Sequence, residues 1–146
     1  MIVKSFELDK IKSETVFFLF HGGNQGHKNE IIKTKFQVKY KDSTYNYDEN
    51  EILINKENFF NNVLSKSFFE NEKLIIINRV TDKILSIVKE LIEKKIEDVV
   101  LILNADILEK KSKTRSLFEK DKELACVAFY EDNNQTLSSI VNNFFR

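Results

Sequence analysis

Four short and almost continuously apolar runs constrain this chain more than any other feature of its sequence. They are "TVFFLF" at 15–20, "KLIIIN" at 73–78, "DVVLILN" at 98–104 and "LACVAFY" at 124–130. Runs of this length and composition are typical of strands that are buried on both faces. Amphipathic stretches separate them, and this alternation indicates parallel strands joined by right-handed helical crossovers. We therefore predict a doubly wound α/β domain.

The remaining segments complete this expected architecture. The amphipathic stretches predict helices at 26–41, 56–69, 81–95, 111–122 and 134–146. The run "EILI" supplies a short fifth strand, and the polar, tyrosine-rich segment 42–50 is expected to be a loop or hairpin. We found no linker and no internal repeat, so residues 1–146 are predicted to form a single domain with a five-stranded, mostly parallel sheet.

Helical periodicity also predicts which side chains face the core. In the helix at 81–95, Thr81 is a suitable N-cap. Its apolar stripe is expected to consist of Ile84, Leu85, Val88, Leu91 and Ile92. The helix at 26–41 is expected to turn inward Ile31, Ile32, Phe36 and either Val38 or Tyr40.

The composition argues against several classes of protein. The 146 residues suffice for one domain with a substantial core, and 23 basic residues balance 23 acidic ones. A net charge of zero argues against a strongly electrostatic DNA or membrane binder. Cys126 is the single cysteine and is expected to be buried, so a disulfide framework is excluded and a reducing, cytoplasmic setting is predicted. The apolar runs are too short to span a bilayer.

The first apolar run is followed by a glycine-rich loop, "HGGNQGHKN" at 21–29. A Walker A loop requires G-x-x-x-x-G-K-[ST] between a strand and a helix. Counted from Gly22, the lysine falls on Lys28, but His27 occupies the second glycine position and Asn29 replaces the hydroxyl. The candidate residues of this degenerate phosphate loop are Gly22, Gly23, Gly26 and Lys28. Either the loop is a strand-to-helix turn that uses glycine for its backbone angles, or it retains weak nucleotide binding.

Other candidate chemical groups are isolated in the sequence. Asp106 follows an apolar strand and is placed like a Walker B acid, although a helix cap or a solvated turn is the alternative. His21 and His27 flank the glycine loop without a third metal ligand nearby. No nucleophile and base stand together. We therefore predict no catalysis, no metal site and no cofactor.

A basic run lies near the fourth apolar strand. It consists of Lys110, Lys111, Lys113 and Arg115. Such a run is compatible either with a solvated helix face or with a contact to DNA phosphates.

Two adjacent phenylalanines, Phe68 and Phe69, stand at the end of a predicted helix and just before a buried strand. Adjacent helical residues point about 100° apart, so one core-facing stripe rarely buries both. Phe68 and Phe69 follow Leu64 by four and five residues. Either both cover the core, or at least one is exposed at the helix tip, where an aromatic residue can anchor a partner.

These segments, taken in order, resemble one protein family. The degenerate loop, "SKSFFENEKLIIIN" and "ADILEKKSKTRSLFEKDKELACVAFYED" resemble the delta subunit of bacterial DNA polymerase III, a clamp-loader subunit. The pattern L-x-K-x-S-K-x-R-x-L-F-E-K at 108–120 adds to this similarity. The resemblance covers nearly the whole chain but matches only the N-terminal domain of the family. It implies a P-loop NTPase (AAA+)-like fold and two further domains that this chain lacks.

The resemblance also implies a function and a binding site. In the family, a Leu-Phe pair at a helix tip inserts into a hydrophobic pocket of the beta sliding clamp. Phe68 and Phe69 occupy these positions here, with Leu64 and Ser67 beside them on the same helix. Phenylalanine in place of leucine keeps the apolar character and adds bulk.

The resemblance implies a mechanical role, because in the family the delta subunit does not hydrolyse ATP. It binds the clamp and opens the ring for loading onto primed DNA during replication. Its other partners are the gamma/tau and delta prime subunits of the DNA polymerase III holoenzyme, contacted mainly through regions absent here. Contact with primer-template DNA is expected to be weak or indirect, and no membrane partner is expected.

Overall fold

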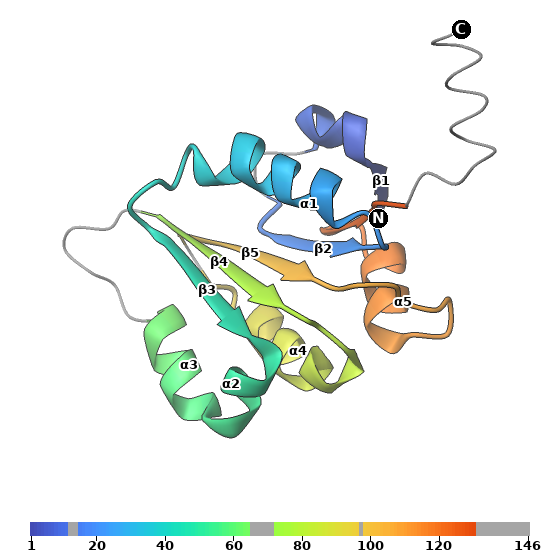
Figure 1. Ribbon diagram of the computed structural model, residues 1–146. Helices are drawn as coiled ribbons and strands as arrows, with labels where there is room; N and C mark the ends of the chain where they lie inside the picture. The colour runs from blue at the N-terminus through green and yellow to red at the C-terminus, as the bar shows by residue number, and fades with distance from the viewer. Residues whose placement is uncertain (12–14, 65–71, 97, 131–146) are drawn as a thin grey trace, which may run out of the picture.

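The computed structural model describes residues 1–11, 15–64, 72–96 and 98–130 (Figure 1). The strands are β1 (Ile2–Lys4), β2 (Phe17–His21), β3 (Thr44–Asp48), β4 (Lys73–Asn78), β5 (Val99–Asn104) and β6 (Leu124–Ala128). The α-helices are α1 (Gln25–Ile31), α2 (Glu49–Ile54), α3 (Lys56–Leu64), α4 (Leu85–Glu93) and α5 (Lys113–Lys120). The other helical elements are η1 (Ser5–Lys10), the π-helix η2 (Ile32–Gln37) and η3 (Asp82–Ile84).

The predicted α/β class and parallel sheet are confirmed, but the predicted number of strands is wrong. Over the described residues the sheet has six strands, all parallel, in the order β1-β6-β2-β5-β4-β3. The two edge strands, β1 and β3, were not predicted. Edge strands are half exposed and lack the continuous apolar run that marks a central strand. β3 therefore lies within the polar segment that was expected to be a loop or hairpin.

The run "EILI" belongs to helix α2 and is not a strand. A capping box starts this helix, because the Asp48 side chain accepts from the third helical amide and Glu51 accepts from the Asp48 amide at 3.2 Å. Only Ile52 of its apolar residues is fully buried, whereas Ile54 is exposed. A short apolar run fits either a strand or a helix, and here the cap decides for the helix.

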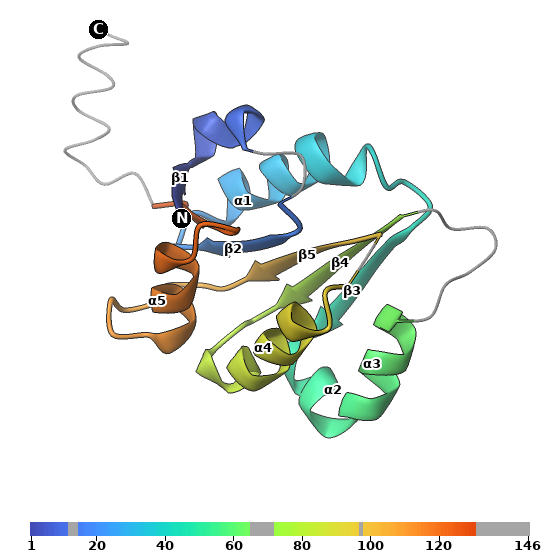
Figure 2. The ribbon, with the colours of Figure 1, turned by 180° about the vertical axis from the view of Figure 1, so that it is seen from behind.

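The sheet separates two apolar layers, because alternate residues of each strand face opposite sides. Figure 2 shows α1 on one side of the sheet and α3 and α4 on the other. One layer joins Leu19, Leu101 and Leu103 to the helices α3, α4 and α5. The other joins Phe18 and Phe20 to the helix formed by α1 and η2, with η1 beside it. All five residues of β2 are buried. Cys126 is also buried, as predicted, and burial raises the pKa of its thiol to about 12.

Most of the helix predictions hold within the described residues. Thr81 caps η3, accepting from the Lys83 amide at 3.2 Å. Of the predicted stripe, Ile84, Val88, Leu91 and Ile92 belong to the core or pack against it, together with Ile87, whereas Leu85 is only half-buried and is not part of that cluster. Of the two residues offered as the last inward position of the first helix, Tyr40 is half-buried and Val38 is 69% exposed. The prediction that Val38 faces inward is therefore wrong. No helix of the described ranges is both long and apolar enough to cross a bilayer. The helix predicted at 134–146 and the last turn of the one at 56–69 lie outside these ranges.

A single carboxylate holds the start of α5 against the turn that begins the preceding crossover helix. Asp82 accepts from the Ser112 hydroxyl at 2.7 Å and from the amides of Thr114 and Lys113 at 3.0 and 3.1 Å. Ser112 is itself the N-cap of α5 and accepts from the Arg115 amide at 3.2 Å. Partial burial opposes ionisation of Asp82, but these donors outweigh it and lower the pKa of the carboxyl to about 2.

The hydrogen bonds of Asp82 make the free energy of unfolding depend on pH in the acidic range. The pKa of Asp82 is lower in the folded chain (about 2) than its ordinary value of 3.8, so its contribution is present above pH 3.8 and is lost as the pH falls through about 2. We expect Asp82→Asn to lower the free energy of unfolding by about 1 kcal/mol at neutral pH. It should also flatten the fall in stability between these two pH values. Urea unfolding at a series of pH values measures both effects.

The matched control is Asp9→Asn, which removes a carboxylate that pairs with Lys35 on the surface and is 79% exposed. Exposed pairs of this kind contribute little to stability. Equal acid sensitivity of both variants and the parent would contradict the role of Asp82.

Candidate functional site

The candidate site lies at the carboxyl edge of the sheet, between the loops that follow β2 and β5. β2 leads to α1 on the face of Phe20, whereas β5 leads to α5 on the face of Leu103. Neighbouring parallel strands whose connections diverge in this way leave a crevice beyond their carboxyl ends, which is the usual ligand site of such sheets. The glycine loop, residues 22–24, lies at this point, and Asp106 follows β5 beside it.

The glycine loop packs directly against the chain that leaves β6. Gly22 has φ = 111°, in the region that favours glycine. A Cβ at this position would lie 2.2 Å from the Phe129 carbonyl oxygen. The Phe129 amide donates to the His21 carbonyl at 2.7 Å, and its carbonyl accepts from the Asn24 amide at 3.0 Å. The glycine is therefore needed for a close approach of two backbone segments, which is a structural role.

Five backbone amides of the loop and of the first turn of α1 have partners within the chain. A phosphate loop needs such amides free, because they cradle the phosphates. The donor–acceptor pairs are Gly22 to the Asp106 carbonyl (2.8 Å), Asn24 to that of Phe129 (3.0 Å), Gln25 to that of Gly23 (2.9 Å), His27 to the Asn24 side chain (3.1 Å) and Lys28 to the Asn24 carbonyl (3.1 Å). Gly26 lies in α1 itself and is exposed. The loop is therefore closed.

Lys28, the residue in register with the Walker lysine, points into the protein. Its side chain is fully buried, and its ammonium donates to the Ala105 carbonyl. Burial lowers the pKa of this ammonium, and the nearby charge of Asp106 partly offsets the effect. A lysine that binds phosphate must reach into the crevice, whereas Lys28 fastens α1 to the end of β5.

Asp106 lies in a solvated turn, which the sequence offered as an alternative to a Walker B acid. The residue is exposed, its carboxylate accepts from the Gln25 side chain, and its carbonyl accepts from the Gly22 amide. Gln25 was missed, since an exposed glutamine at a helix start has no distinctive sequence signal. Asn78 and Asn104 were also missed, although each ends an apolar run; the Asn104 amide donates to the Asn78 oxygen at 2.9 Å.

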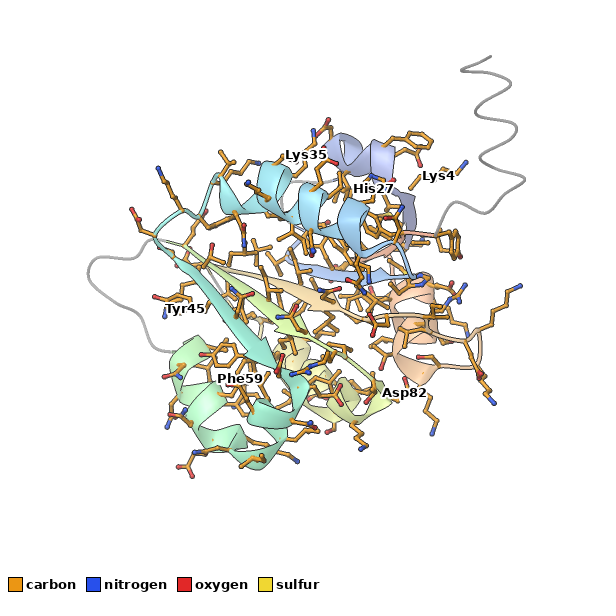
Figure 3. All side chains as sticks on the ribbon, in the orientation of Figure 1. Lys4, His27, Lys35, Tyr45, Phe59 and Asp82 are labelled. Atoms are coloured by element: carbon orange, nitrogen blue, oxygen red, sulfur yellow. The ribbon has the colours of Figure 1, made fainter. Side chains whose placement is uncertain are left out.

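The two histidines of the loop lie in different surroundings. His21 is buried, and burial together with the Arg115 charge lowers its pKa to about 4. Its ring is therefore neutral near pH 7 and adds no positive charge to the loop. His27 packs edge-to-face on Phe129 with ring centroids 5.1 Å apart (Figure 3). Within the ranges that the structure covers, no group of three metal-ligating side chains is present.

The basic run does not form one free cationic face. Arg115 donates to Glu119 at 3.0 Å and to the Leu108 carbonyl at 2.7 Å, and only 12% of its side chain is exposed. Lys111 pairs with Glu109 at 3.2 Å. Lys110 and Lys113 are exposed. The pattern at 108–120 therefore describes how α5 is capped and fastened.

The residues predicted to bind a clamp are described only in part. Leu64 ends α3 and is 42% exposed. Ser67, Phe68 and Phe69 lie outside the described residues. The part of α3 that precedes them is held on the sheet by Phe59 and Val63, which are buried in the core.

Comparison with known proteins adds no relative to this picture. No protein-family model matches the chain, and no curated protein matches it in sequence. Its functional assignment therefore depends on the geometry above and on the sequence motifs.

The closed loop predicts opposite effects for two glycine substitutions. Gly22→Ala places a methyl group against the Phe129 carbonyl at a positive φ, so we expect unfolding free energy to fall by about 2 kcal/mol or more. Gly26→Ala is the matched control, because its Cβ would have only the Asn24 side chain near it, at 3.8 Å. A helical alanine should be neutral or add about 0.5–1 kcal/mol. Urea denaturation measures both, and equal tolerance would contradict the close approach.

Proposed function

We propose that this chain is a non-catalytic, P-loop-like module of a DNA polymerase III clamp loader, which binds the beta sliding clamp and opens it during replication. The observation that carries the proposal is the closed glycine loop. It occupies the ligand position of the fold, yet five amides of the loop and of the first turn of α1, together with the Lys28 side chain, are bonded within the protein. A fold of this kind without its phosphate chemistry is suited to serve as a binding scaffold. The motif resemblance supplies the partner.

The arrangement of α3 supports a binding role for the segment that follows it. Phe59 is buried and its ring lies edge-to-face with Tyr47, with centroids 5.2 Å apart, while Val63 is buried one turn later (Figure 3). These contacts fix the helix against the sheet. Leu64, at the end of the helix, is partly exposed. Aromatic anchors carry a large share of interface energy, and we place one in the segment that follows Leu64.

Opening of a ring requires more than contact. The module must bind the open conformation of the clamp more tightly than the closed one, since only a difference in affinity shifts the equilibrium. In the proposed mechanism Phe68 and Phe69 enter a hydrophobic pocket of the clamp. Neighbouring residues, including Leu64 and Ser67, press near the interface between clamp subunits. ATP binding by the other loader subunits makes this helix accessible.

Binding of the whole chain to the cognate beta clamp tests the proposal. We expect Phe68→Ala/Phe69→Ala to weaken the affinity by about tenfold or more, because aromatic anchors carry a large share of interface energy. Biolayer interferometry gives the affinity, and circular dichroism shows whether the variant keeps its fold.

The matched control is Phe6→Ala/Ile107→Ala, which removes two side chains that are 78% and 76% exposed elsewhere on the surface. This variant should bind like the parent. Equal binding by the anchor variant would refute the role of the two phenylalanines. Failure of the parent chain to bind would refute the clamp-loader assignment.

Nucleotide titration tests the non-catalytic part separately. We expect no saturable binding of ATP with Mg²⁺ up to about 1 mM, because the loop amides and Lys28 are already engaged. Isothermal titration calorimetry measures this. Saturable binding that Lys28→Met abolishes and Lys33→Met preserves would favour the nucleotide-binding alternative.

A further inference from the structure

A cavity of about 360 Å³ lies at the opposite edge of the sheet from the glycine loop. It opens near the amino ends of β2 and β5, between the sheet, η1 and the π-helix η2. Its lining residues are Leu8, Asp9, Ile11, Thr15, Phe18, Thr34, Lys35, Phe36, Lys39, Tyr40 and Val100. Its volume falls in the range of small-molecule sites.

The walls of the cavity combine aromatic and aliphatic side chains with polar ones. Phe18 and Phe36 lie edge-to-face with ring centroids 5.1 Å apart, and Tyr40 adds a third ring. Leu8, Ile11 and Val100 complete the apolar part of the lining. Aromatic side chains arranged at an angle prefer a flat aromatic guest, which can meet one ring face-on and another edge-on.

A second, independent feature marks the same place. The residues Ile32–Gln37 form a π-helix, a rare conformation that occurs frequently at functional sites. This turn supplies Thr34, Lys35 and Phe36 to the lining. Lys35, at this end of the helix, lies well apart from His27 near its start (Figure 3).

Of the two lysines in the described lining, one is paired and the other is exposed. Lys35 pairs with Asp9 at 3.3 Å. Burial and the neighbouring Glu72, which accepts a hydrogen bond from the hydroxyl of Tyr40, raise the pKa of that tyrosine, so it remains neutral. Lys39 is exposed at the rim, and no ion pair involves it within the described part of the chain.

We propose that this cavity binds a small planar aromatic acid, with its ring against Phe18, Phe36 and Tyr40 and its acid group facing Lys39. Contact with the three rings supplies the affinity, and the lysine selects the anion over a neutral analogue. This site shares no residue with the proposed clamp-binding segment, so the two proposals stand or fall separately.

The test uses the whole chain and two probes of the same ring size, 1-naphthoate and neutral 1-naphthalenemethanol. From the efficiency typical of small ligands we expect 1-naphthoate to bind with Kd near or below about 1 mM. The neutral probe should bind at least about fivefold more weakly. Amide chemical shifts in NMR spectra should change around Phe18, Phe36 and Val100.

Two variants with matched controls locate the site. Val100→Phe fills the cavity and should weaken naphthoate binding by about tenfold, whereas Val38→Phe adds the same bulk at an exposed position and should not. Lys39→Gln should remove the preference for the anion, whereas Lys33→Gln, on the same helix but outside the lining, should keep it.

Absence of saturable naphthoate binding below about 10 mM would overturn the proposal. So would binding that neither Val100→Phe nor Lys39→Gln affects, since the probe would then bind elsewhere. If Val100→Phe fails to fold, the Lys39→Gln comparison and the map of shifted amides decide alone.

Discussion

The burial of β2 on both faces is the constraint on which the rest of the structure depends. This strand lies between β5 and β6, and all five of its residues are buried. A parallel strand in that position must be covered by crossover helices on both sides, so α1 with η2 takes one face and α3, α4 and α5 take the other. The same arrangement places the loop after β2 where two connections diverge.

Close packing of that loop then determines its chemistry. The chain continues beyond β6 so that Phe129 lies against Gly22, while Lys28 and Asp106 tie the loop and α1 to the end of β5. At the position where related architectures hold ligands, five amides and the Lys28 ammonium are thereby bonded within the protein itself. Gly22 is required because the backbone of Phe129 lies too close to leave room for a Cβ. The buried Lys28 donates to the Ala105 carbonyl and lies near the charge of Asp106. This is the physical basis for proposing a scaffold without nucleotide chemistry.

Both proposals for binding therefore concern regions other than the carboxyl edge of the sheet. α3 is fixed to the core by Phe59 and leads to the segment in which we propose the clamp anchor. The cavity beneath the π-helix lies at the amino ends of β2 and β5 and uses the ring of Phe36 on the layer opposite α3. Both proposals rely on the rigidity of the same sheet, but they concern different faces and different chemistry.

The sequence by itself determined the four buried strands, the α/β class, the cap at Thr81 and the stripe of α4. Each follows from local periodicity and apolar content, which a single segment carries. The edge strands β1 and β3, the helical state of "EILI" and the order of the strands were decided by tertiary structure, because half-exposed strands carry little signal and pairing depends on distant partners. In the glycine loop the sequence showed that the Walker pattern fails. Only the fold showed why the loop is closed, since Phe129 and Asp106 reach Gly22 from more than eighty residues away along the chain.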